Sequence, residues 1–99
     1  MPRMIFVNLP VADLPRAMAF YEAIGFTKDP RFSNEQSSSM QWSDTIVLML
    51  LGHDFYQTFT PKTIIDAHTT SGALIALNFD SRAEVDAITE KAIAAGARE

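Results

Sequence analysis

Apolar residues follow two different spacings at the start of the chain. Every second residue from Ile5 to Val11 is aliphatic, which is the period of two expected of a strand with two unlike faces. From Leu14 onward the apolar residues recur on one helical stripe, with Asp13 before it as a suitable N-cap and Gly25 after it as a suitable C-terminal stop. This pattern predicts a strand that leads directly into an amphipathic helix.

The same succession returns near the end of the chain. Between Ala73 and Asp80 every second residue is apolar, namely Ala73, Ile75, Leu77 and Phe79, and these alternate with Leu74, Ala76, Asn78 and Asp80. Ser81 and Glu84 have the spacing of a capping box, and an apolar stripe then runs to Gly96. A unit of strand and helix that occurs twice indicates two related modules.

Three further strands are predicted between these units. They are Phe26–Phe32, which is weak because it contains a proline, Ser37–Trp42, whose serines are expected to be exposed, and Thr45–Leu51, which is the most hydrophobic and therefore central. The segment 52–72 is too long for a routine connection, and Thr63–Ala67 is predicted to form one helical turn in it. The resulting order is β-α-β-β-β, a long loop, then β-α, which predicts an α+β fold.

Composition excludes several classes of function. The chain has 99 residues, no cysteine and a formal charge of −4, so it is one domain or less, carries no disulfide or thiolate chemistry, and fits a cytoplasmic protein. It contains no basic run, which disfavours nucleic acid as a partner. Its longest apolar run, Ile46–Leu51, is far shorter than the roughly 20 residues that span a bilayer, so no membrane role is expected.

The segments NLPVADLPRAMAFYEAIGF, SDTIVLMLL and FTPK, with the closing strand and helix, resemble the vicinal oxygen chelate superfamily of glyoxalase, bleomycin resistance and dioxygenase proteins. Within it, the chain is most similar to the bacterial group of predicted lactoylglutathione lyases. The resemblance implies paired βαβββ modules whose sheets form a ligand-holding cup. On this basis residues 1–52 are the first module, 53–72 a connecting loop, and 73–99 a partial second module, truncated after its strand and helix. Strand edges left without neighbours predict a homodimer.

The resemblance also implies positions for a metal site. Metal-dependent members carry histidines on the first and fifth strands and carboxylates on the fourth and last. The matching positions are Phe6, Leu74 and, for the fourth strand, a residue near Met49, while the last would lie beyond Glu99. These side chains are apolar, so we expect no bound metal, no other cofactor and no glyoxalase I activity. His53 and His68 are the only histidines that a noncanonical site could use.

A binding protein is the function that these residues favour, with a small molecule held in the cup. The candidate ligand-binding residues are apolar, aromatic or amide side chains: Phe6, Asn8, Met49, Tyr56, Phe59, Leu74 and Asn78. For the asparagines, capping of a strand end or satisfaction of nearby backbone is favoured over ligand binding, and the two loop aromatics equally suit a dimer interface. Two alternatives stay open: a metal-dependent lactoylglutathione lyase-type enzyme, and a structural homo-oligomer whose cup is filled by its own side chains. Whether the protein is an enzyme is therefore not decided by the sequence.

Overall fold

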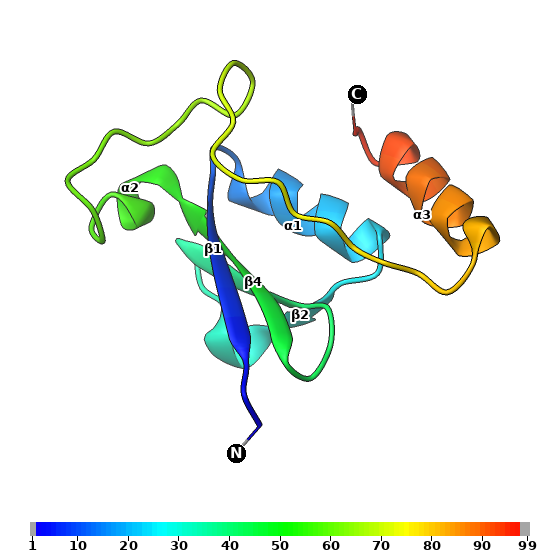
Figure 1. The fold of residues 1–99 in the computed structure, drawn as a ribbon. Coiled ribbons are helices and arrows are strands. Elements are labelled where there is room, and N and C mark those ends of the chain that lie inside the picture. The colour runs from blue at the N-terminus through cyan, green and yellow to red at the C-terminus, as the bar shows by residue number, and fades with distance from the viewer. Residues whose placement is uncertain (1, 98–99) are drawn as a thin grey trace.

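A computed structural model of the protein describes residues 2–97 and centres on a four-stranded sheet (Figure 1). The elements in chain order are β1 (Ile5–Val11), α1 (Leu14–Ala23), β2 (Thr27–Asp29), the 3-10 turn η1 (Pro30–Phe32), β3 (Ser37–Gln41), β4 (Ile46–Gly52), α2 (His53–Tyr56) and α3 (Arg82–Ala94). No helix within residues 2–97 has the length and apolar character needed to cross a membrane.

The strand order is β1-β4-β3-β2, which places the hydrophobic strand β4 inside the sheet. β1 and β4 run parallel, whereas β4 with β3 and β3 with β2 are antiparallel. Val47 and Leu50 of β4 are almost completely buried, at 1% and 0% exposed. The predicted central position of this strand is confirmed. The predicted weakness of the segment before β3 is also confirmed, because β2 is a short edge strand that ends directly before Pro30.

Helix α1 begins and ends at the predicted signals. The backbone N–H of Arg16 donates to the Asp13 side chain at 3.1 Å. At the other end Gly25 has a φ of 112°, which a residue with a Cβ rarely adopts. The N–H groups of Gly25 and Phe26 then donate to the carbonyls of Glu22 and Tyr21, which is the Schellman pattern.

The core lies between α1 and one face of the sheet. Its buried members come from α1, β3, β4 and the residue after Gly25: Leu14, Phe26, Met40, Leu48 and Leu50. Aromatic contacts extend it, because the Trp42 ring lies tilted against Phe26 at a centroid distance of 4.9 Å and edge-on to Phe79 at 5.8 Å. Leu77 packs against the same cluster, so the segment after residue 72 is held on the α1 side of the sheet.

The strand predicted for Ala73–Phe79 is absent from the described residues. This segment passes over α1 and carries α3 alongside that helix (Figure 1). A strand needs a neighbour that shares its backbone hydrogen bonds, and the segment lies along a helix rather than along a sheet edge. Two alternate residues of this segment, Leu77 and Phe79, instead pack against the core, while Leu74 is 95% exposed.

Two local predictions were also wrong. The helical turn in the long loop is α2 at His53–Tyr56 rather than Thr63–Ala67, where the Asp66 side chain instead accepts from the N–H of His68 and turns the backbone. The serines of β3 are buried, at 5% exposed or less, because β3 has a neighbouring strand on each side and elements on both faces.

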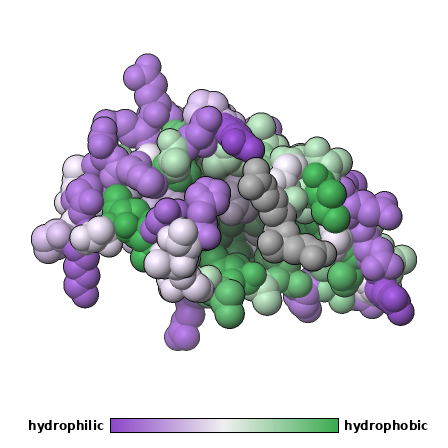
Figure 2. All heavy atoms as spheres, turned by 90° about the horizontal axis from the view of Figure 1, so that it is seen from above, coloured by the Kyte–Doolittle hydropathy of each residue, from purple (hydrophilic) through white to green (hydrophobic). Residues whose placement is uncertain are grey.

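Helix α3 forms as predicted, but its apolar stripe is not fully covered. Val85 is 44% exposed, and Ile88, Ala92 and Ala95 are only partly buried. The whole chain exposes 7658 Å², against about 5,600 Å² for a compact monomer of its mass. Figure 2 shows hydrophobic atoms at the surface between hydrophilic ones. The chain therefore exposes more surface than a compact domain of its mass, and part of that surface is apolar.

Candidate functional site

The sheet face opposite α1 carries a cavity of about 450 Å³, which we call the cup. Strands β1, β3 and β4 form its floor, and η1 forms one side. Phe6 and Met49 supply apolar wall, Asn8 and Gln41 supply amides, and Arg31 supplies a guanidinium group. The cup therefore combines an apolar surface with a few polar side chains, as small-molecule sites do.

The register of the sheet explains why these side chains meet. Asn8 of β1 lies opposite Met49 of β4, Met49 opposite Ser39 of β3, and Ser39 opposite Asp29 of β2. Side chains at paired positions share one face of a sheet, so this row crosses all four strands on the cup side. A second row begins with Phe6 and passes through Val47 and Gln41.

Three of the residues predicted from the sequence meet at the cup: Phe6, Asn8 and Met49. Tyr56 ends α2, and Phe59, which is 69% exposed, contacts Phe55 at a centroid distance of 5.2 Å; neither lines the cup.

Leu74 and Asn78 are exposed in the segment that packs on the α1 side, so within the described chain they do not join the cup. Their predicted place at the cup depended on a fifth strand, and that strand does not form.

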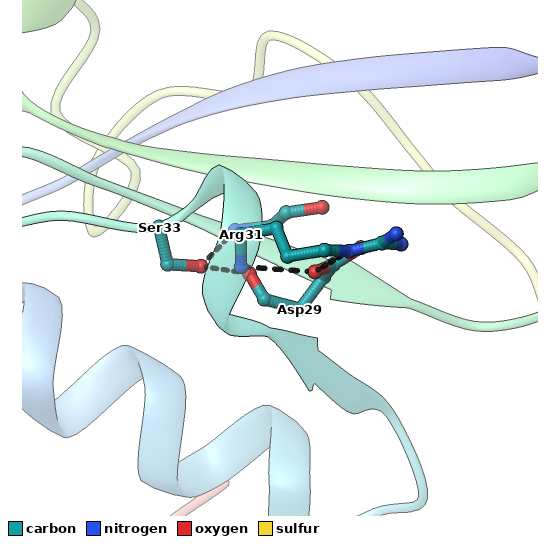
Figure 3. A network of polar contacts seen from close by, with 4 residues as sticks. Asp29, Arg31 and Ser33 are labelled. Carbon is teal, nitrogen blue, oxygen red and sulfur yellow. Dashed lines mark hydrogen bonds and ion pairs between the residues drawn. The ribbon is translucent and has the colours of Figure 1, made fainter.

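An ion pair at the cup was missed by the sequence reasoning. Asp29 is 6% exposed, and its carboxylate accepts from the Nε and Nη2 of Arg31 at 3.1 and 3.0 Å (Figure 3). It also accepts from the backbone N–H of Arg31 at 3.0 Å, as the cap of η1. The side-chain hydrogen bond from Arg31 lowers the pKa of Asp29 below its ordinary value of 3.8. The available signal was Asp29 before Pro30, a typical start for a helical turn.

Ser33 ties this ion pair to the sheet. Its hydroxyl donates to the carbonyl of Asp29 at 2.7 Å (Figure 3). The same hydroxyl oxygen accepts from the N–H of Ser39 at 3.1 Å. The η1 turn is thereby fixed against β3, while the Arg31 side chain stays 77% exposed at the rim of the cup. The guanidinium carbon lies 5.4 Å from the ring centroid of Phe32, within cation–π range.

Comparison with known proteins shows which family model and which solved structures are similar to this chain. Residues 3–36 match the family model described as bleomycin resistance protein-like N-terminal. A hypothetical protein from S. aureus superposes with a TM-score of 0.78 at 23% identity, over 97% of this chain and 71% of that one. A glyoxalase/bleomycin resistance protein/dioxygenase family enzyme from Burkholderia phytofirmans superposes with a TM-score of 0.70 at 20% identity, over 96% and 74%. The comparison with curated proteins gives no match.

The chain has the vicinal oxygen chelate fold. The predicted α+β class and resemblance to glyoxalase, bleomycin resistance and dioxygenase proteins are thus confirmed at the level of the fold. In this four-stranded sheet, the cup lies on the face opposite α1.

The residues at the cup do not suit the divalent metal that the superfamily implies. Phe6 and Met49 offer no nitrogen or oxygen donor, and the carboxylate of Asp29 is already engaged by Arg31. His53 lines a different hollow, near the start of α1, and His68 lies in the turn of the long loop. Within residues 2–97, no three side chains of the metal-binding types lie close enough to hold one ion.

The ion pair predicts a pH dependence of stability. Because the pKa of Asp29 is depressed in the folded protein, its contribution is present above the ordinary value of 3.8 and is lost as the pH falls through the folded pKa. The difference in unfolding free energy between wild type and Asp29→Asn should be constant near neutral pH and shrink below about pH 4. Urea unfolding at several pH values measures it.

The matched control is Asp86→Asn, since Asp86 is 66% exposed and lies 3.9 Å from the 94% exposed Arg82. That variant should differ little from wild type at any pH. An Asp29→Asn difference that stays the same from neutral to acidic pH would contradict the assignment.

Proposed function

We propose that this protein binds a small, largely apolar molecule in the cup. The observation that carries the proposal is a cavity of about 450 Å³ on the sheet face opposite α1, walled by Phe6 and Met49 with Asn8 beside them. That volume is within the usual range of about 300–1,000 Å³ for small-molecule sites. A cavity of this size also favours binding over a structural role in which side chains fill the cup.

We infer that this binding needs no metal. The positions that match the superfamily's first and fourth strand ligands are apolar. Among residues 2–97, Asp29 is the only acidic side chain that lines the cup, and it is neutralised by Arg31. A lyase of glyoxalase type needs a metal to stabilise negative charge on its substrate. The match of residues 3–36 to a family named for bleomycin resistance proteins accords with a binding role.

Ligand binding should appear as localised chemical-shift changes. In a screen of small aromatic compounds followed by nuclear magnetic resonance, we expect the shifted backbone amides to cluster in β1, β3 and β4. Phe6→Ala should weaken a bound compound roughly tenfold, because one large apolar contact is lost. Phe6 is 54% exposed, so its truncation should leave the fold intact.

Phe59→Ala is the matched control, because Phe59 is a similarly exposed phenylalanine outside the cup. Shift changes confined to α3, or equal losses in both variants, would refute binding in the cup.

Metal content separates the binding function from the enzyme alternative. We expect zinc and nickel to be substoichiometric in purified protein by mass spectrometry, and no turnover of methylglyoxal with glutathione. Stoichiometric metal with turnover, both abolished by His53→Ala or His68→Ala, would instead establish a noncanonical enzyme.

We further propose that the protein is a homodimer. Its excess of exposed area over a compact monomer is roughly 2,000 Å², more than the about 800 Å² that each partner contributes to a typical interface. Its radius of gyration of 14.1 Å likewise exceeds the about 13 Å of a compact domain of this length. The exposed apolar residues of α3 and of the segment before it, such as Leu74 and Val85, are the proposed contact surface.

Sedimentation should therefore give about twice the chain mass of 11.0 kDa. Leu74→Glu should shift the equilibrium toward monomer, because it puts a charge into an apolar contact. Thr69→Glu, an equal change of charge in the exposed loop, should not. A monomer at the highest concentration reached would refute the dimer.

A further inference from the structure

We propose that the Asp29–Arg31 pair is the polar anchor of the cup and makes it select uncharged ligands with a carbonyl oxygen, such as aromatic carboxamides, over the corresponding carboxylates. This inference rests on the proposed binding function and adds the chemical class of the ligand. It uses two residues that the sequence did not single out.

The geometry leaves part of the guanidinium available. Arg31 gives its Nε–H and one Nη2–H to the Asp29 carboxylate, which leaves three of its five N–H donors. These donors lie on the side of the guanidinium away from Asp29, and the side chain is 77% exposed at the rim of the cup. A ligand oxygen that enters the cup can accept from them.

The orientation of the guanidinium is set before a ligand arrives. Two side-chain hydrogen bonds to a nearly buried carboxylate hold the planar group, and Ser33 fixes the turn that carries both residues. A preorganised donor loses less conformational freedom on binding than a mobile one. This argues for a positioned recognition group rather than a solvated surface arginine.

Charge decides between a neutral and an anionic ligand. Asp29 lies 3.0 Å from the Nη2 of Arg31 and cancels its charge, so the anchor has no net charge. A ligand carboxylate on the free side would be attracted by Arg31 and repelled by Asp29, and would also lose hydration on entering an apolar cup. A neutral carbonyl receives hydrogen bonds from the same donors without the repulsion, and it loses less hydration than a carboxylate does.

Two amides at the cup match this chemistry. Asn8 and Gln41 line the same cavity from β1 and β3. Each amide carries both donors and an acceptor, so they complement a ligand group that itself has both. A carboxamide satisfies the guanidinium with its oxygen and an amide oxygen of the protein with its N–H.

The test compares naphthalene-2-carboxamide with 2-naphthoate, which share one ring system and differ in charge. Affinities come from titrations followed by nuclear magnetic resonance, with the Arg31 Nε–H and the amides of β1 and β4 as reporters. Wild-type protein should bind the carboxamide about fivefold or more tightly than the naphthoate. The Arg31 Nε–H signal should shift with the carboxamide.

Asp29→Asn is the decisive variant, because it keeps the shape of the side chain and leaves the charge of Arg31 uncompensated. It should reverse the preference, so that 2-naphthoate binds more tightly than the carboxamide. Arg31→Gln should weaken the carboxamide about tenfold, through loss of a charged donor. Asp86→Asn and Arg82→Gln make the same changes of charge in an exposed pair on α3 and should leave both affinities unchanged.

The outcomes separate this inference from the binding function. Equal affinities, a wild-type preference for naphthoate, or a preference that Asp29→Asn leaves unchanged would overturn the anchor while binding in the cup stands. The same reversal in Asp86→Asn would also overturn it, because net charge alone would then explain selectivity. If neither compound shifts the amide signals of β1 and β4, the result counts against both the anchor and the cup as a binding site.

Discussion

The parallel pairing of β1 with β4 is the constraint on which the other features of this fold depend. Parallel neighbours cannot be joined by a tight turn, so the chain must cross over, and here α1, β2 and β3 lie within that connection. The helix takes the face that carries Val7, Leu9 and the core side chains of β4. The side chains at the alternate positions of each strand point to the opposite face of the sheet, and the cup lies there.

Much of this arrangement could be predicted from the sequence because short-range chemistry determines it. Period-two alternation identified β1 and its two faces, and Gly25 with Phe26 identified the end of α1. The family resemblance placed Phe6 at the cup, and the pleat then puts Asn8, two residues further along β1, on the same face. The facing of β4 was open in the sequence, and the pairing of Asn8 with Met49 decides it.

The errors come from features that alternation alone does not specify. A strand is defined by its hydrogen-bonded neighbour as much as by its pattern, and Ala73–Phe79 shows the pattern while Leu77 and Phe79 pack on the helix side. The Asp29–Arg31 pair escaped notice for a different reason. The pattern around Pro30 indicates a weak strand rather than the η1 turn that brings Arg31 back onto Asp29, and only the row that passes through Ser39 shows that this turn borders the cup.

The position of Trp42 has a spectroscopic consequence. It is the only tryptophan of the chain and it lies directly after β3 on the core side of the sheet, in contact with Phe26 and with Phe79 of the C-terminal segment. The sheet separates its indole ring from the cup. Tryptophan fluorescence of this protein should therefore report how the C-terminal segment packs on the core. It should change little when a molecule occupies the cup on the opposite face.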